Sequence, residues 1–415
     1  MTYISDCRFQ NNKATQSGGV IAILSGVLTV ELSQFDQNQA TNFGGDVFMN
    51  GTAQVTIGQS TFTKGQANNG GSIYCESGSL MIDSTAFSST AANNDGGIYV
   101  ADGTFHFTNS NYSASNAAGN GGAIYTATAA AVVQITNGVF NNNLANLGGA
   151  VYVGAGDVSS SFSKYEQNEG KTQGGAIYLA TATSFSSVTD RFLTNKAPAG
   201  GAIYDSDVPK VTVSSSSFQF NSATSTDGGA IYFRIGTHRL SNIVSQTNQA
   251  ARDGGLIYIN TGVNVTIDST SNLVGDIAAA DGGCIYVSQG EVHLSATVID
   301  QAQAGGNGGA LYLGASTSTG TSTSTTFSNN VANGNGGGVY VTTGNTFNSG
   351  ANTMYTKNRA SQDGGDIYAE TATTVTLQNN VVSQSQANNN GASIYFSSGS
   401  LMIDSTAFSS TAANN

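Results

Sequence analysis

The chain repeats itself about every 26 to 27 residues, and this period limits the fold more than any other feature. Two glycines followed by a small residue, an aliphatic residue and a tyrosine recur, as in Gly174-Gly175-Ala-Ile-Tyr178. Fifteen copies run from Ala22 to Tyr395, which is 395 − 22 = 373 residues over fourteen steps. Self-similarity at a period of about 20 to 50 residues indicates a solenoid.

A second signature, Phe/Tyr-x-x-Asn-x-Ala, lies between successive glycine doublets. One copy is Phe140-Asn-Asn-Asn143-Leu-Ala145, and weaker copies carry Leu273, Ile299 or Val382 in place of the aromatic residue. Each unit is too short for a β-α-β module, and it lacks the characteristic residue spacing of leucine-rich, hexapeptide or calcium-binding repeats. Short runs of Val, Ile, Thr and Tyr bounded by Gly, Asn and Ser indicate strands.

These observations predict an all-β fold, a right-handed parallel β-helix of about 15 coils. We expect residues 1–415 to form one continuous β-helix in which each coil supplies two or three strands. Each strand would pair with its equivalent in the next coil, at the usual spacing of about 4.8 Å.

Alternation along the strand predicts which side chains face the interior. The Ile177 and Leu179 positions are apolar in nearly all copies, so both should point inward and Tyr178 outward. The position before Ile177 accepts Asp46 and Asp366, which suggests that it also avoids the interior. The outward row comprises Tyr74, Tyr99, Tyr125, Tyr152, Tyr178, Tyr204, Tyr232, Tyr258, Tyr286, Tyr312, Tyr340, Tyr368 and Tyr395.

The asparagine that follows the aromatic residue is expected to have a structural role. A turn repeated in every coil stacks its side-chain amides, and asparagine tolerates the left-handed backbone conformation. The aromatic residue itself should point inward and form a buried column. The predicted asparagine ladder consists of Asn12, Asn38, Asn143, Asn168, Asn195, Asn221, Asn248, Asn330 and Asn358.

The two signatures together resemble the repeats of the polymorphic outer-membrane proteins of chlamydiae and related surface β-helix proteins. The segment from Phe140 through Asn143 to Gly148-Gly149-Ala-Val-Tyr152 carries this resemblance, and the paired motif covers nearly the whole chain. The resemblance implies a right-handed β-helical passenger on a cell surface, used for adhesion and self-association.

The tyrosine row is a candidate interface. Tyrosine on a rigid sheet offers contact area at low entropic cost and keeps a hydroxyl group for hydrogen bonds. The row could pack laterally against another β-helix, stack on extended glycans, or contact host or cell-surface proteins. Alternatively, it is a self-stacked ladder that only stabilises the sheet.

Three aspartates precede glycine doublets in consecutive coils and form a weak candidate for a calcium site. Asp227, Asp253 and Asp281 would lie about 5 Å apart, and Ca²⁺ accepts several oxygen ligands in loose geometry. Asp-Gly is also a common turn pair, and we expect the turn role. Three cysteines and three histidines show no metal-ligand spacing, so no cofactor is expected.

Charge and hydropathy exclude further classes. The net charge is −12 with no lysine or arginine cluster, which disfavours nucleic-acid binding. No transmembrane segment is present, because no apolar run approaches about eighteen residues. A polysaccharide lyase or hydrolase would need clustered carboxylates and bases, and the nearest approaches are Asp190-Arg191 and Asp205-Ser-Asp207-Val-Pro-Lys210. We therefore expect a protein that is not an enzyme.

The segment Ser77–Asn94 recurs identically at Ser398–Asn415, which suggests recent duplication. We expect a fragment or protomer of a longer array without terminal caps, because solenoid ends expose unpaired strand edges. The resulting hypothesis is a non-catalytic structural repeat protein, extracellular or on a cell surface, that forms a filament by end-to-end or lateral association. The alternative is the passenger domain of an autotransporter-type adhesin.

Overall fold

The computed structural model describes residues 1–413, and within them every regular element is a β-strand. Parallel strands lie in stacked coils, so the chain forms a β-solenoid of about 15 coils, which confirms the predicted fold class. The coils divide into two compact units. Unit 1 comprises residues 1–197 and 202–210, and unit 2 comprises residues 198–201 and 211–415.

Each complete coil contains four strands, so the expectation of two or three was too low. In one coil of unit 1 they are β5 (Val27–Glu31), β6 (Gln34–Asp36), β7 (Gln39–Ala40) and β8 (Val47–Met49). The additional strand is the two-residue β7, which follows the Phe-x-x-Asn turn. A strand this short carries no alternation that sequence patterning could detect.

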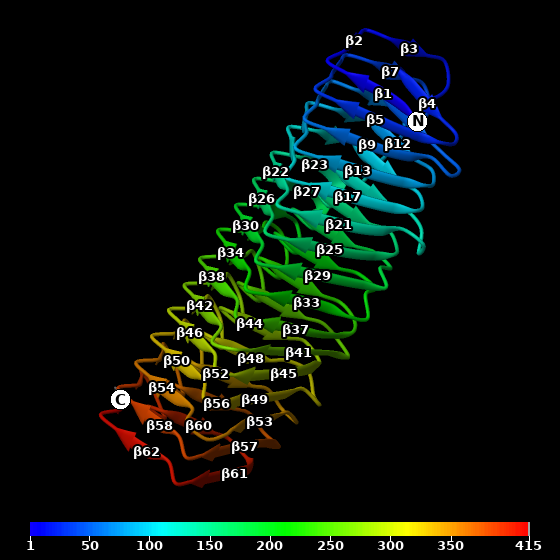
Figure 1. Cartoon of the computed structure of the whole chain (residues 1–415). Coiled ribbons are helices and arrows are strands. Elements are labelled where there is room, and N and C mark those ends of the chain that lie inside the picture. Colours follow the sequence, from blue (N-terminus) through cyan, green and yellow to red (C-terminus); the bar gives the residue numbers. More distant parts are fainter. Residues whose placement is uncertain (414–415) are drawn as a thin grey trace. The chain divides into compact units, whose positions relative to one another are not determined.

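Successive coils pair in strict parallel register. Strand β5 pairs with β9 (Gln54–Gly58), so that Leu28 lies opposite Val55 and Val30 opposite Ile57. Both pairs of aliphatic side chains face the interior, because in β5 and β9 these residues are buried and the residues between them are exposed or of intermediate exposure. Equivalent side chains therefore form columns along each unit. Figure 1 shows the equivalent strands of successive coils following one another within each unit.

In unit 1 each of the four sheets has eight strands, beginning with β1 (Thr2–Ser5) in the first sheet. The fourth sheet carries the tyrosine positions. Its strands are β4 (Ile21–Ile23), β8, β12 (Ile73–Cys75), β16 (Ile98–Val100), β20 (Ile124–Thr126), β24 (Val151–Val153), β28 (Ile177–Leu179) and β32 (Ile203–Asp205).

Unit 2 repeats the arrangement, and its described strands run from β33 (Val211–Ser214) to β63 (Ala412–Ala413). One representative coil comprises β41 (Val263–Asp268), β42 (Asn272–Val274), β43 (Ile277–Ala278) and β44 (Ile285–Val287). The other strands of its fourth sheet are β36 (Ile231–Phe233), β40 (Ile257–Ile259), β48 (Leu311–Leu313), β52 (Val339–Val341), β56 (Ile367–Ala369) and β60 (Ile394–Phe396).

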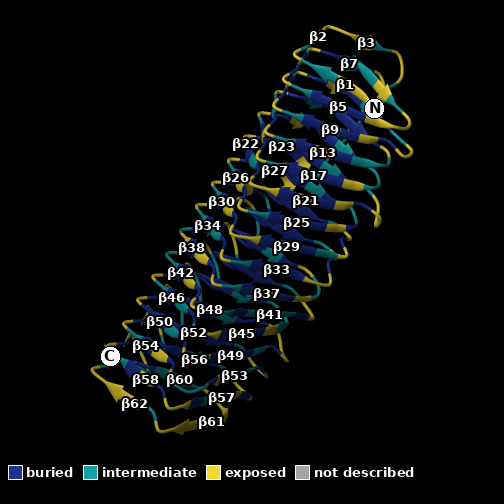
Figure 2. Ribbon diagram, viewed as in Figure 1, coloured by how far each residue is buried: buried dark blue, intermediate teal, exposed yellow. Residues whose placement is uncertain are grey.

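The core consists of apolar columns, and the residues that form them are buried. Buried residues are dark blue in Figure 2. The aromatic residue of the second signature points inward, as predicted, and its rings stack from coil to coil. Phe35 and Phe62 have ring centroids 4.4 Å apart, and Phe140 lies 5.0 Å from Tyr165. All four side chains are buried. Such pairs add to the stability gained from burying the rings.

Glycine is required at the corner before each fourth-sheet strand. Gly148 has φ +61°, and the next residue, Gly149, approaches the following coil so closely that an added Cβ would lie 2.3 Å from the backbone oxygen of Gly175. A methyl group would force the two coils apart, so the doublet sets the close approach of backbones at this corner.

Candidate interaction surface

The tyrosine row lies on the outer side of the fourth sheet. Ile177 and Leu179 are fully buried on either side of Tyr178 along β28, so the tyrosine faces the opposite way. Tyrosines of successive coils occupy paired positions, for example Tyr152 opposite Tyr178. The row therefore exists in both units: Tyr74, Tyr99, Tyr125, Tyr152, Tyr178 and Tyr204 in unit 1, and Tyr232, Tyr258, Tyr286, Tyr312, Tyr340, Tyr368 and Tyr395 in unit 2.

The rings of the row stack face to face. Centroid distances run from 4.7 Å between Tyr74 and Tyr99 to 5.4 Å between Tyr178 and Tyr204, and Tyr125 is within 3° of parallel with Tyr152. Stacking covers the ring faces, so each tyrosine of the row is either buried or of intermediate exposure. The smallest values, 6–9 %, belong to Tyr74, Tyr178, Tyr204, Tyr258 and Tyr340.

This geometry removes one of the binding modes considered above. A glycan that stacks on tyrosine needs a free ring face, and a tyrosine that has a row neighbour in both adjacent coils, such as Tyr125 or Tyr312, has both faces covered. What the row presents outward is the ring edge with its hydroxyl group. Tyr340, for example, donates a hydrogen bond of 2.6 Å to Oε1 of Glu370.

Partial burial also changes the acidity of the row. Desolvation raises the pKa of Tyr74 to about 12, and the neighbouring Tyr99 adds to the shift. The pKa values of Tyr125 and Tyr286 are raised for the same reason, with nearby aspartates contributing. The phenols therefore stay protonated at physiological pH and act as hydrogen-bond donors and acceptors.

The asparagine ladder is present, and all of its members except the exposed Asn12 are buried. Asn168 shows the full pattern: its Nδ2 donates to the Phe140 carbonyl and to Oδ1 of Asn195, while its Oδ1 accepts from the amide and Nδ2 of Asn143. Equivalent bonds join Asn12 to Asn38, Asn221 to Asn248 and Asn330 to Asn358. These residues satisfy one another inside the core, which is a structural role.

The expected backbone conformation of the ladder was wrong by one residue. Positive φ belongs to the residue before each ladder asparagine, for example Asn142 at +59° and Gln167 at +54°, and Asn143 itself is not left-handed. The turn places the left-handed residue on the outside and directs the following amide inward. Side-chain hydrogen bonding, rather than tolerance of positive φ, explains asparagine at this position.

The position before the inward isoleucine was also misassigned. Asp46 and Asp366 are buried, as are Ser72, Ala123 and Leu256 at the same place in other coils. The backbone turns at the glycine corner, so this residue points into the interior beside the asparagine ladder instead of alternating with its neighbour. Buried carboxyl groups are stabilised there by hydrogen bonds from the ladder.

The three aspartates proposed for calcium form a backbone-binding column instead. Oδ1 of Asp227 accepts the amide of Asp253 at 3.1 Å, Oδ1 of Asp253 accepts that of Asp281 at 3.0 Å, and Asp281 accepts the Asn307 amide at 2.6 Å. Asp227 also forms an ion pair with Arg252. Among residues 1–413, no group of three or more His, Cys, Asp or Glu side chains is arranged to hold a metal ion. These contacts support the turn role.

The nearest approach to a catalytic cluster does not form one. Asp190 is buried, where its carboxylate accepts hydrogen bonds from the Ser163 amide and the Ser187 hydroxyl. Burial raises its pKa to about 6. Arg191, the next residue, is exposed on β30 (Arg191–Leu193). The Asp190 carboxyl group is therefore in the interior, whereas Arg191 is at the surface.

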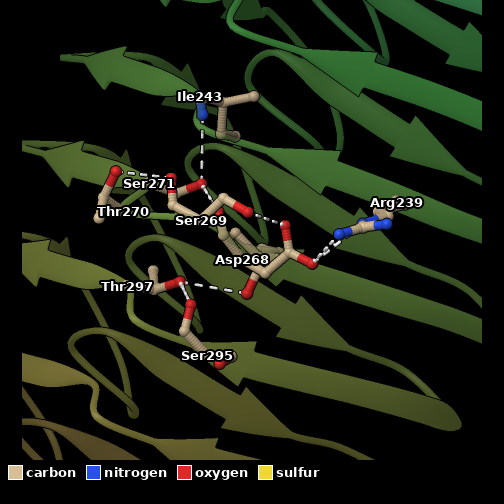
Figure 3. Close-up of polar contacts among 9 residues, drawn as sticks. Arg239, Ile243, Asp268, Ser269, Thr270, Ser271, Ser295 and Thr297 are labelled. Carbon is tan, nitrogen blue, oxygen red and sulfur yellow. Dashed lines mark hydrogen bonds and ion pairs between the residues drawn. The ribbon is translucent and has the colours of Figure 1, made fainter.

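A second polar column, of serine and threonine, escaped the sequence interpretation. At the turn after the first-sheet strand, Ser271 accepts the Ile243 amide and donates to the Asp268 carbonyl, and Thr297 donates to the Ser295 carbonyl (Figure 3). The signal was a Ser or Thr two residues before the aromatic position, as in Ser33, Ser60, Thr85 and Ser110.

Figure 3 also shows how this turn carries charge on its outer side. The guanidinium of Arg239 contacts Oδ2 of Asp268 at 2.8 Å and 2.9 Å, and Ser269 donates to Oδ1. Burial acts to raise the pKa of Asp268, but the hydrogen bonds from Arg239 and the serines outweigh it and lower the pKa. This exposed pair contributes little to stability.

The fold and the surface define the class as a parallel β-helix repeat protein. Residues 324–342 match the family model of the Chlamydia polymorphic membrane protein repeat. This segment contains β50 (Thr326–Ser328), β51 (Val331–Ala332) and β52, with Phe327, Asn330 and Tyr340 of the two signatures. The match confirms the resemblance inferred from those signatures.

No curated protein and no solved structure matches the chain. The repeat match and the β-solenoid together fit a surface-associated structural repeat protein, such as an autotransporter passenger. Within residues 1–413 there is no helix with the length and apolar character needed to cross a membrane.

Proposed function

We propose that this chain is a non-catalytic, extracellular or cell-surface β-solenoid that associates with itself into filaments. The observation that carries this proposal is the pair of identical segments at 77–94 and 398–415. Leu80 and Phe87 in the first segment are 0 % and 1 % exposed, whereas Leu401 and Phe408 in the second are 38 % and 44 % exposed. In Figure 2, β61 (Gly399–Asp404) and β62 (Ala407–Ser409) are accordingly yellow.

The open face of the last coil carries the same apolar side chains that are buried between coils elsewhere in the chain. Leu401, Ile403 and Phe408 are the side chains that a further coil would cover, and the β61 backbone has an unpaired edge. A following coil of a longer chain or a second copy of this chain would cover it equally. Apolar side chains next to an unpaired strand edge favour association.

Introducing charge on this face provides the test. Leu401→Lys with Ile403→Lys should shift the purified chain from assemblies toward monomers in light scattering and electron microscopy. Met402→Lys is the matched control, because Met402 pairs with Thr376, which alternates with the buried Val375 and Leu377 opposite Leu401 and Ile403. If the wild-type chain remains monomeric at high concentration, or if all variants assemble alike, self-association through this face is wrong.

A second candidate function is adhesion through the tyrosine row. Because the ring faces are covered, we propose that glycans or host or cell-surface proteins contact the row by hydrogen bonds to its hydroxyl groups. Tyr125→Phe, Tyr152→Phe and Tyr178→Phe together keep the stacking but remove three hydroxyls.

Binding to a glycan array or to cells should fall in this triple variant. It should persist when Gln134 and Ser159 on the outer side of the first sheet are changed to alanine. Equal binding by both variants would reduce the tyrosine row to a stabilising ladder.

A further inference from the structure

Phe162 occupies a turn position in unit 1 that favours neither its ring nor its backbone conformation. The residue lies between the first and second sheets with φ +54°, and its side chain is 59 % exposed. A bulky side chain at positive φ is sterically unfavourable. Val188, at the end of β29 (Ser184–Val188), is 36 % exposed, and its carbonyl accepts the Phe162 amide. In the other coils of unit 1 this turn residue is polar except for Leu32: Asp6, Gln59, Ser84, Asn109, Asn137 and Thr189.

Two cations flank these apolar side chains. Lys164, on β26 (Lys164–Glu166), pairs directly with Arg191 on β30, and both residues are exposed. Like charges placed opposite each other on paired strands are destabilising. Within residues 1–413 neither cation has an ion-pair partner, and Glu166, the acid on the outer side of β26, leaves the net charge positive. We call Phe162, Val188, Lys164 and Arg191 the basic patch.

A groove of the opposite charge lies in the same unit. Its volume is about 300 Å³, and Glu31, Gly58, Met81 and Asp83 are among the residues that line it. Gly58 leaves a notch between the two carboxylates, because it pairs with Glu31 on one side and with Asp83 on the other. Met81 is 45 % exposed and supplies an apolar wall. A cavity of about 150 Å³ already holds a benzene ring, so this acidic groove is large enough for a phenylalanine side chain.

The charge of the acidic groove is not neutralised within the described chain. Oε2 of Glu31 accepts a hydrogen bond from the Tyr3 hydroxyl at 2.7 Å, and Oδ1 of Asp83 accepts one from Nδ2 of Asn109 at 2.9 Å. These donors are uncharged, and no lysine or arginine is among the described residues that line the groove. The groove therefore attracts a cation that approaches from outside.

The groove and the patch lie on one column of paired residues. The strands that carry it are β5, β9, β13 (Ser79–Asp83), β17 (Thr104–Thr108), β21 (Val132–Thr136), β25 (Asp157–Ser161) and β29, which follow one another in Figure 1. Their last residues pair in the order Glu31, Gly58, Asp83, Thr108, Thr136, Ser161 and Val188. Three coils separate Asp83 from Ser161, which is about 14 Å at the usual strand spacing.

We propose that the basic patch of one copy of this chain docks into the acidic groove of a second copy, so that two copies of unit 1 form a lateral pair. When the two β-helix axes are antiparallel, Ser161 of each copy faces Asp83 of the other, and Val188 faces the notch at Gly58. The same contact then forms twice, which is the self-complementary arrangement of a two-fold dimer.

Each contact in this pair joins groups that are unsatisfied in the single chain. Phe162 enters the groove beside Met81, and a thioether sulfur next to an aromatic ring is a favourable contact. Lys164 lies in the coil that faces Asp83. Arg191 lies one coil further on, at the level of the notch, between the two carboxylates of the groove. Opposite charges at matching positions fix the register of such an interface.

This inference rests on the proposed function, because it assigns a lateral face to the same self-association. The end face uses Leu401 and Ile403 of unit 2, whereas the lateral face uses unit 1 alone. The variant Leu401→Lys with Ile403→Lys therefore isolates the lateral contact. It falls to monomers when dilute, and we expect it to form dimers of twice the 42.2 kDa chain mass as its concentration rises in sedimentation equilibrium.

Charge exchange in this variant tests the contact itself. Lys164→Glu with Arg191→Glu gives a patch that repels the groove, and Glu31→Lys with Asp83→Lys gives a groove that repels the patch. Each of these two chains alone should dimerise about a hundredfold more weakly. An equimolar mixture should recover the original dimerisation, because both contacts of the mixed pair again join opposite charges. A misfolded chain would not recover, so the recovery also shows that both variants fold.

Two further variants complete the test. Lys64→Glu with Lys171→Glu makes the same change of charge at exposed residues of unit 1 outside the patch and the groove, and it should leave dimerisation unchanged. Phe162→Ser removes only an exposed side chain and should weaken dimerisation about tenfold or more.

The lateral pair is overturned if the Leu401→Lys, Ile403→Lys chain stays monomeric at high concentration while the wild-type chain assembles. It is also overturned if the chains with reversed charge or Phe162→Ser dimerise as strongly as their parent. Binding of a sulfated glycan to the patch of a chain that stays monomeric would make the glycan the occupant and refute the pair. A wild-type chain that forms dimers but no longer assemblies would instead contradict association through the end face.

Discussion

The duplicated segment allows a comparison of the same side chain in two environments. Phe87 is 1 % exposed and stacks between Phe62 and Tyr112, each with a centroid distance of 4.8 Å. Truncating a buried phenylalanine destabilises a protein by about 3–5 kcal/mol through lost transfer energy and the cavity that remains. Phe408 occupies the same sequence but is 44 % exposed and pairs with Val382 on one side.

Phe408→Ala should therefore cost about 1–2 kcal/mol, because roughly half of the apolar area is at stake and the terminal coil can relax. Guanidinium unfolding followed by circular dichroism should show a large midpoint shift for Phe87→Ala and a small one for Phe408→Ala. The denaturant slope must be compared as well, since repeat arrays can unfold in parts. Equal shifts for the two variants would refute the assignment of Phe87 to an interior column.

Three further changes test the other columns. Asn168→Ala should cost about 1–3 kcal/mol for each buried donor or acceptor left unpaired, measured as unfolding free energy. Gly149→Ala should destabilise the protein by about 3 kcal/mol, because the added methyl group clashes with the backbone of the next coil. Gly262→Ala is the control and should cost about 1 kcal/mol, because Gly262 has φ +76° but no atom lies near the added Cβ. Equal shifts of the melting temperature in the two variants would contradict this. Burial lowers the pKa of His238 to about 4, so its stabilising contribution should be lost as pH falls from 6.5 to 4, and His238→Gln should lack that loss.

The stacking of like residues was predictable because the repeat supplies the same side chain at the same place in every coil. The aromatic position shows this well: Phe140, Tyr165 and even Leu273 are all buried, as the pattern requires. The tyrosine row was likewise placed on the correct side of its strand. Both inferences rest on the two-residue alternation of a β-strand, which sequence displays directly.

Features that depend on corner geometry were not predictable. The left-handed turn position is occupied by Phe220 in one coil and Lys357 in another, residue types that give no sign of positive φ. Asp46 resembles a solvent-exposed turn residue in sequence, and its burial follows from the turn of the backbone at the glycine corner, which also buries Ser72 and Leu256 at the same position. The exposure of the tyrosines could not be predicted without the orientation of their rings, because pairing of the backbone positions does not show whether the ring faces are covered.

The central claim is that equivalent residues of successive coils lie directly beside one another in each unit. The double substitution Tyr152→Cys with Tyr178→Cys, in a chain that also carries Cys7→Ser, tests it most directly. Paired strands place these two Cα atoms at about 4.8 Å, within disulfide range, whereas residues 152 and 204 are two coils apart.

Mild oxidation followed by mass spectrometry should therefore join 152 to 178 rapidly and leave the 152/204 pair reduced. Failure of the first pair to form a disulfide in the folded protein, or equal reaction of both pairs, would contradict the in-register stacking of coils.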